Sequence, residues 1–265
     1  MFSSKRITTL GGSKFQDNWS FDANSNSPSD YIRLSGTGYY ESILQSSFSV
    51  SVWLTYNDAD SDATQAICGI KNDNDNWFYL GIHGTGGNDG KLAYYHKSDG
   101  NTNSRVFGDA FADGPRDWTH VVWTIKMNTA TNGAKCYVDG VLHGVAATNG
   151  IDDTQWAAFD GNSLNMMIAG YNNGSGGISN VHGGKISEFA IYNTVLDAND
   201  VATIYNGREP FDHKAWSKSR NVAGWYRFGD GNEAGSGTTI YDMSGQGNNG
   251  TILGGEGDEF QGDTP

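Results

Sequence analysis

The residues that could carry out catalysis are scattered along this sequence and are not paired. Glycoside hydrolysis needs two carboxyl groups about 5–9 Å apart, so a strand that supplied both would carry acidic residues at alternate positions. Of the six glutamates, only Glu188 lies in a strand-like run, "KISEFAI", and no second acid follows it there. The chain also lacks Gly-x-Ser-x-Gly, His-x-x-x-His and Cys-x-x-Cys spacings. We therefore expect a protein that is not an enzyme.

The stretch "RDWTHVVWTIKM" contains the histidine that most resembles a functional residue. Its side chains alternate, so Val121 and Trp123 face one side of a strand and His120 faces the other. We expect the first pair in the core, and His120 in a half-buried slot with its ring nitrogens hydrogen bonded. Asp139-Gly140 then predicts a tight hairpin turn, because a type I′ turn needs positive φ at both positions. These residues are expected to build structure.

The composition indicates an acidic, glycine-rich protein. The chain has 265 residues, 37 glycines, 4 prolines and a formal net charge of −13. Such a charge repels polyanions, so we expect no nucleic acid partner and no anionic membrane partner. No apolar run is long enough for a signal peptide or a membrane span, which predicts neither signal-led export nor membrane insertion. Cys68 and Cys136 lie in strand-like runs and are expected to be buried free thiols, with a disulfide between them as the alternative.

Short alternating segments separated by Gly, Asn and Asp predict an all-β, antiparallel two-sheet sandwich. The expected strands include 48–56, 66–73, 77–83, 90–96, 118–127, 164–171 and 184–192, and 135–144 is expected to form a hairpin. One short helix is expected over 198–205. Asp197 can cap its start, Asp200 stands three residues later, and Gly207 follows its end.

Three regions are expected along the chain. Residues 1–19 would form an N-terminal arm, 20–210 the main domain and 211–265 a C-terminal extension. Residues 209–221 at this boundary show no periodicity and are expected to form a linker or a strap across the surface. Residues 223–253 contain further strand-like runs. Because a lone hairpin is marginally stable, we expect 223–253 to pair back on the sandwich, with packing on a neighbouring subunit as the alternative.

The order of these motifs resembles the laminin-G-like, concanavalin A-like jelly-roll superfamily of lectins and glucanases. The most specific motifs are "WTHVV", followed about twenty residues later by "YVDG", and "GKISEFAIYNTVLDANDV". The resemblance covers about residues 20–207 and implies a jelly roll, a fold that serves many functions. "AGWYRFGDGNEAGSGTTIYDMSGQGNNGTI" is similar to a segment that often lies beside such domains, usually before them. The combination resembles virion proteins of bacteriophages.

The resemblance also implies a structural Ca²⁺ ion. Many superfamily members hold one between an aspartate of an early strand and an acidic residue near the last strand. By position, Asp22 or Asp30 and Glu188 correspond to these ligands, and carboxylates suit the ion. The segment "FDANSNSPSDY" is longer than the family's short Phe-Asp-Gly turn.

A carbohydrate site would need exposed aromatic rings with polar groups around them. Trp156, in the polar stretch "IDDTQWAAFDGNS", is the leading candidate, followed by Tyr171 and Trp77. Core packing is the alternative for each of them.

Three functions of different classes remain open. The first is a non-catalytic structural or adhesion protein of a phage virion, such as a capsid decoration or fibre component. Its partners would be other virion proteins or copies of itself, with a cell-surface glycan as a further candidate. The alternative is a carbohydrate-binding lectin module of a cellular or secreted protein. The third is a glycoside hydrolase or lyase.

Overall fold

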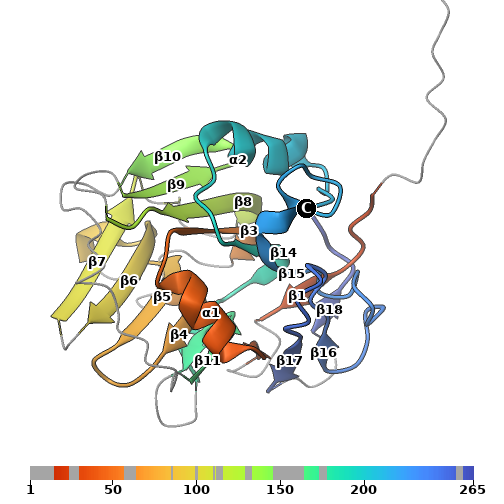
Figure 1. Cartoon of the computed structure of the whole chain (residues 1–265), viewed down its shortest axis with the longest axis horizontal. Helices are drawn as coiled ribbons and strands as arrows, with labels where there is room; N and C mark the ends of the chain where they lie inside the picture. The colour runs from red at the N-terminus through yellow and green to blue at the C-terminus, as the bar shows by residue number, and fades with distance from the viewer. Residues whose placement is uncertain are drawn as a thin grey trace, which may run out of the picture.

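Two antiparallel eight-stranded sheets pack face to face in the computed structural model (Figure 1). The structure describes residues 15–23, 30–56, 64–84, 86–98, 101–109, 111, 116–128, 133–145, 164–172, 178–254 and 259–265. The predicted β-sandwich is confirmed. Within the described residues, no helix is both long enough and apolar enough to span a membrane.

The first sheet, which we call the β3 sheet, has the strand order β10-β9-β8-β3-β14-β1-β18, with β15 paired to β14. Its strands are β1 (Ser20–Asp22), β3 (Phe48–Tyr56), β8 (Arg116–Ile125), β9 (Ala134–Val138), β10 (Val141–Val145), β14 (Lys185–Tyr192), β15 (Val222–Tyr226) and β18 (Phe260–Gln261). The β9–β10 turn is the predicted one, since Asp139 has φ 48° and Gly140 has φ 80°.

The second sheet, the β5 sheet, has the order β16-β17-β2-β11-β4-β5-β6-β7. Its strands are β2 (Tyr31–Leu34), β4 (Gln65–Lys71), β5 (Trp77–Ile82), β6 (Leu92–Ser98), β7 (Asn101–Phe107), β11 (Leu164–Ile168), β16 (Thr239–Ile240) and β17 (Gly250–Leu253). A separate pair, β12 (Tyr171–Asn172) and β13 (Ile178–Ser179), follows β11.

Two short α-helices accompany the sheets, where one was predicted. Helix α2 (Ala198–Tyr205) is the predicted helix. The Asp197 side chain accepts hydrogen bonds from the backbone N–H groups of Asn199 and Asp200 at 2.9 Å, so the predicted cap is present. Helix α1 (Thr37–Leu44) was not predicted. It follows Gly36 at φ 75° without a side-chain cap, and so lacks the usual sequence mark of a helix start. Short 3₁₀ turns are η1 (Gly86–Asn88), η3 (Asn206–Arg208) and η4 (Ser219–Asn221).

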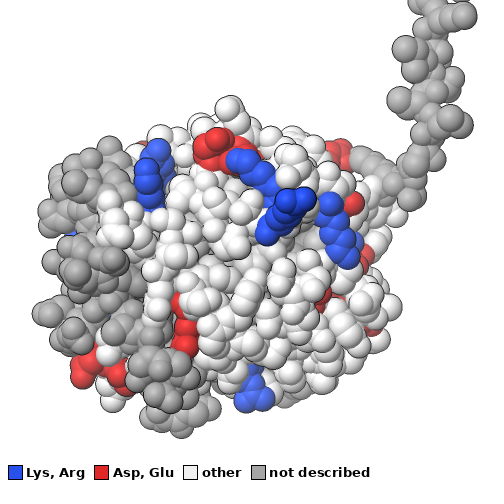
Figure 2. Space-filling model, in the orientation of Figure 1, with Lys and Arg blue, Asp and Glu red and all other residues white. Residues whose placement is uncertain are grey.

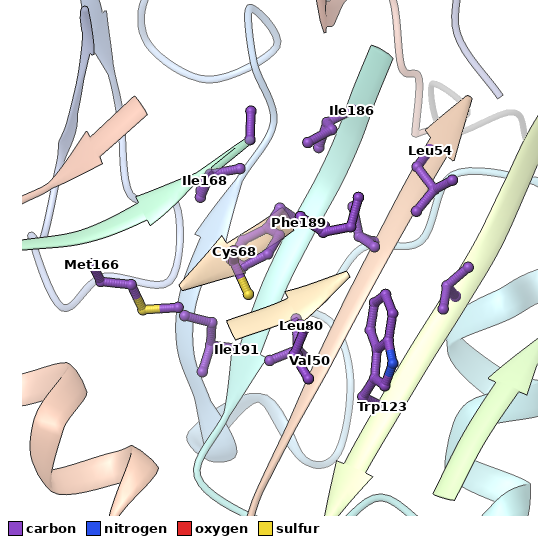
Figure 3. Close-up of a cluster of buried hydrophobic side chains, with 14 of the residues drawn as sticks. Val50, Leu54, Cys68, Leu80, Trp123, Met166, Ile168, Ile186, Phe189 and Ile191 are labelled. Carbon is purple, nitrogen blue, oxygen red and sulfur yellow. The ribbon is translucent and has the colours of Figure 1, made fainter. Parts of the chain in front are cut away.

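The main core lies between the sheets and follows the alternation of the strands. Val50 of β3, Leu80 of β5 and Trp123 of β8 are fully buried and lie together in Figure 3. Each large side chain buried this way contributes about 1.5–3 kcal/mol of transfer free energy. Cys68 and Cys136 are both buried and free, as expected.

The outer face of the β3 sheet is also buried, and we call it the covered face. Its apolar cluster consists of Val122, Tyr137, Ala190, Tyr192, Leu196, Val201, Ile204, Val222 and Trp225, with Phe15, Phe211, Trp216 and Met243 packed against it. Helix α2 and the segment that follows it supply much of this second layer (Figure 1). Both faces of the central part of the β3 sheet therefore exclude water, whereas the edge strand β10 exposes Val141 and Leu142.

The C-terminal part of the chain adds strands to both sheets. Strand β15 pairs with β14, and β17 pairs with β2 in the other sheet. Strand β18 pairs with β1, so the last residues lie beside the first described strand. The division of the chain at residues 19 and 210 stays a prediction from the sequence.

Candidate functional site

The outer face of the β5 sheet carries a group of aromatic side chains. Along β5, Phe78 and Leu80 point into the core, so Trp77 and Tyr79 point outward. Tyr95 of β6 stands directly across from Tyr79 in the ladder. We call Trp77, Tyr79, Tyr95 and Tyr171 the aromatic cluster.

The rings of the aromatic cluster stack in a row with Tyr79 in the middle. The centroid of Tyr79 lies 4.6 Å from that of Tyr95 and 4.8 Å from that of Tyr171, with interplanar angles of 20° and 21°. Trp77 stacks on Tyr79 at 5.4 Å. Such stacked pairs contribute about 0.5–1.5 kcal/mol each beyond their buried area.

Gly69 of β4 makes the approach of Tyr171 to Tyr79 possible. It stands opposite Tyr79 in the ladder. A Cβ atom at Gly69 would lie 2.6 Å from Tyr171 Cβ and 2.7 Å from Tyr79 Cβ, closer than real Cβ contacts come. The missing side chain therefore lets a residue from β12 join an aromatic row built on β5 and β6.

The four rings of the aromatic cluster differ in solvent exposure: two are buried and support the others, and two remain accessible. Tyr79 is 6% exposed and Tyr95 is 8% exposed, whereas Trp77 and Tyr171 are half-buried. Burial raises the pKa of Tyr95 to about 12 and raises the pKa of Tyr171. The phenols therefore stay protonated near neutral pH and can donate hydrogen bonds.

A polar turn borders the aromatic cluster at Trp77. Lys71 and Lys97 stand on either side of Trp77 in the ladder. The Lys71 ammonium donates to Asn74 Oδ1 at 2.9 Å, and the Lys97 ammonium pairs with Asp75 at 2.9 Å. Fixed donors thus lie beside a half-buried indole ring, an arrangement that suits a hydroxylated ring with an apolar C–H face.

The sequence candidates for a carbohydrate site are only partly located. The ring centroids of Trp77 and Tyr171 lie 6.1 Å apart in the aromatic cluster. Trp156 lies outside the described residues. The site candidates named from the sequence omitted Tyr79, although the alternation that places Trp77 on the outer face also places the residue two positions later there.

The residues proposed as calcium ligands serve other contacts or lie in different elements. Glu188 is buried, and its carboxylate accepts hydrogen bonds from Trp225 Nε1 at 2.6 Å and Arg227 Nε at 2.7 Å. Asp22 stands opposite Lys185 in the β3 sheet, and Asp30 is fully buried just before β2 of the other sheet. Among the described residues, no group of three or more His, Cys, Asp or Glu side chains could hold a metal ion. Calcium binding stays a prediction.

Two buried acidic residues, Asp17 and Glu188, lie beside Arg227 on the covered face. Asp17 accepts a hydrogen bond from Ser187 Oγ at 2.8 Å, and burial, together with the neighbouring Glu188, raises the pKa of Asp17 to about 9. Burial also raises the pKa of Glu188, but the Arg227 guanidinium opposes this shift. We therefore treat Asp17 as protonated at neutral pH and Glu188 as the anionic partner of Arg227.

His120 is more buried than the sequence indicated. It is 2% exposed and lies on the covered face, where burial lowers its pKa to about 3. Its Nε2 is 2.8 Å from Ser51 Oγ. Nδ1 has no hydrogen-bond partner in the described part of the chain, so the expectation that both nitrogens are satisfied was wrong. The second layer over the β3 sheet, which strand alternation does not reveal, is the reason for this burial.

Comparison with known proteins places the chain in a family. A profile of the concanavalin A-like lectin/glucanases superfamily matches residues 25–202. The chain belongs to this superfamily. No curated protein sequence matches it.

Solved structures share the fold at low sequence identity. The chain is similar to a protein of Bacteroides ovatus that has been proposed to bind carbohydrate, with a TM-score of 0.59 and 20% identity. That match covers 91% of this chain but 59% of the other, so this chain spans less than two thirds of the Bacteroides protein. It is also similar to the CBM40 of the Ruminococcus gnavus IT-sialidase, with a TM-score of 0.48, 15% identity, and 72% and 95% of the two chains covered.

Proposed function

We propose that this protein is a non-catalytic, lectin-like carbohydrate-binding protein and that the aromatic cluster of the β5 sheet forms its binding face. The single observation that carries this proposal is the cluster itself. Solvent-facing sides of antiparallel sheets are usually polar. Stacked aromatic rings that end in half-buried Trp77 and Tyr171 need another explanation.

The aromatic rings and the polar groups beside Trp77 contact different parts of the sugar. Tyr79, covered by Tyr95 and Tyr171, holds its neighbours in place. The C–H face of a sugar ring packs on Trp77 and Tyr171, and the ammonium groups of Lys71 and Lys97 beside the polar turn donate hydrogen bonds to its hydroxyl groups. A cluster that is assembled before the ligand arrives loses little conformational entropy on binding.

The comparisons support the class of ligand. The superfamily to which the chain belongs includes lectins by its description, and the Bacteroides protein of similar fold has been proposed to bind carbohydrate. The non-catalytic part of the proposal is supported by Glu188. This strand carboxylate is buried and hydrogen bonded to Trp225 and Arg227, which leaves it no access to a substrate.

A glycan array followed by calorimetry with the best glycan tests the proposal. Trp77→Ala and Tyr171→Ala are each expected to weaken binding about tenfold or more, because losing one stacked ring costs about 1–2 kcal/mol. Trp216→Ala is the matched control, since Trp216 is also half-buried but packs on the covered face. Unchanged glycan affinity in both cluster variants, or an array without any specific ligand, would overturn the proposal.

The role as a virion component stays a prediction from the sequence. No contact within the described residues favours it over carbohydrate binding. Mass spectrometry of purified phage particles would test it directly, and it would also test the expected location in the virion.

A further inference from the structure

A pocket of about 340 Å³ opens beside β15, on the side of the β3 sheet opposite the main core. It is lined by His213, Lys214, Ser219, Arg220, Val222, Trp225, Ser244 and Gln246. This volume is near the lower end of the range for small-molecule sites, about 300–1,000 Å³. The pocket is separate from the aromatic cluster, which lies on the other sheet.

The two cations of this pocket make no ion pair within the described residues, a property that they share with Lys126 and Lys135, but they lie together at one pocket. Lys97, Lys185, Lys218 and Arg227 each form an ion pair with an Asp or Glu. Lys214 and Arg220 are exposed, and their side chains make no ion pair or hydrogen bond within the described residues. A protein with 30 acidic residues against 17 basic ones thus leaves two cations unpaired at one pocket.

Three carboxylates of neighbouring segments, those of Asp212, Asp242 and Asp200, make hydrogen bonds or ion pairs with groups other than Lys214 and Arg220. Asp212 accepts from the backbone N–H of Lys214 at 2.9 Å. Asp242 accepts from the backbone N–H groups of Trp225 and Ser244 and from the Ser244 hydroxyl. Asp200 accepts from the backbone N–H of Asp197 at 3.0 Å and pairs with Lys218. Figure 2 shows positive side chains gathered over the segment that follows α2, on a protein whose net charge is negative.

The floor of the pocket is apolar and rigid. Val222 and Trp225 are buried, and the Trp225 indole is held by Glu188 and by the edge of His213, 5.0 Å away. His213 Nδ1 lies 3.1 Å from the Tyr192 hydroxyl, and burial lowers the pKa of His213 to about 3, so its ring is neutral. The positive charge of the pocket therefore comes from Lys214 and Arg220 at its rim.

We propose that this pocket binds a compact organic oxyanion. The carboxylate or sulfate group of the ligand meets Lys214 and Arg220, its hydroxyl groups meet Ser219 and Gln246, and its C–H surface faces the inner wall of the pocket, which Val222 and Trp225 back. Arg220 can hold two oxygens of a planar carboxylate at once, and Lys214 adds a point charge. A sugar acid has this chemistry. The proposal goes beyond the proposed function and does not depend on the aromatic cluster.

Calorimetric titration of the full chain with sodium glucuronate, glucose and sodium sulfate tests the proposal. We expect glucuronate to bind, glucose to bind at least about tenfold more weakly, and Lys214→Gln with Arg220→Gln to weaken glucuronate binding about tenfold or more. Arg220→Lys should give part of this loss, because it keeps the charge but removes the two-oxygen contact. The exposed positions of both residues favour normal folding, which the melting temperature checks.

Two further variants decide whether the effect belongs to this pocket. Lys126→Gln with Lys135→Gln removes the same charge elsewhere and should leave glucuronate affinity unchanged. Trp77→Ala should also leave it unchanged, so a failure of the carbohydrate proposal and a failure of this one are distinguishable. The pocket proposal is wrong if the Lys214/Arg220 variant keeps full affinity, if either control loses affinity equally, or if sulfate binds as tightly as glucuronate.

Discussion

The outer faces of the two sheets carry similar apolar side chains but use them differently. On the β3 sheet, Val122, Tyr192 and Trp225 are buried beneath a second layer that includes Ile204 of α2. On the β5 sheet, the aromatic row ends in half-buried Trp77. An apolar outer face therefore contributes to stability where another layer covers it, and provides a binding surface where its rings remain accessible. The predictions below test this contrast.

Removal of residues 211–265 should have the largest effect. The truncated chain loses β15 to β18 and uncovers the part of the outer face of the β3 sheet that α2 does not cover, so we expect insoluble protein on expression. Solubility and thermal unfolding of the fragment 1–210 are the measurements. A soluble fragment with a single cooperative transition would show that the part of the second layer contributed by residues 211–265 is dispensable.

Trp225→Ala and Trp77→Ala compare one tryptophan from each outer face. Trp225 is 2% exposed, so its removal should cost about 3–5 kcal/mol of unfolding free energy. Trp77 is half-buried, and its removal should cost about 1 kcal/mol or less while weakening glycan binding. Denaturant unfolding of both variants gives the two values. Equal losses of stability would remove the distinction between the faces.

Glu188→Gln tests the buried ion pair under the covered face. The change leaves Arg227 without its anionic partner at 2.7 Å, which should cost about 3 kcal/mol. The melting temperature should fall by the same amount with and without EDTA. A fall that appears only when calcium is present would instead support the Ca²⁺ site predicted from the sequence.

Asp17→Asn should change the pH dependence of stability. The carboxyl group of Asp17 has a pKa of about 9 in the folded chain and near 4 in the unfolded chain. Between pH 4 and pH 9, the folded chain therefore holds a proton on this group that the unfolded chain has lost. Its contribution to stability is full below pH 4 and is lost as pH rises toward 9. The variant should therefore gain melting temperature relative to the natural protein as pH rises from 5 to 8. Parallel curves for the two proteins would contradict the raised pKa.

Much of the fold could be predicted because its determinants are local. Alternation over 48–56 and 118–127 indicated strands, Asp197 indicated the start of α2, and Asp139-Gly140 indicated a hairpin. Helix α1 escaped prediction because it has no capping side chain. The burial of His120 escaped it because a strand pattern shows which side chains share a face, and not what covers that face.

The site could be predicted less well because it joins distant parts of the chain. Trp77 and Tyr171 were named as separate aromatic candidates. Their rings come together because Gly69, which stands opposite Tyr79, leaves room for Tyr171 beside that strand. The pocket beside β15 depends on the fold of residues 213–246, where Lys214 and Arg220 follow no periodic pattern.

The sequence by itself determined the sandwich, its hairpin and its capped helix, since side-chain alternation and turn chemistry act between residues a few positions apart. Only the tertiary structure decided that Glu188 meets Arg227, that Tyr171 stacks on Tyr79, and that two cations lie unpaired over Trp225. Those contacts depend on strand order and register. Many distant pairings act together to set both, and no short stretch of sequence contains them.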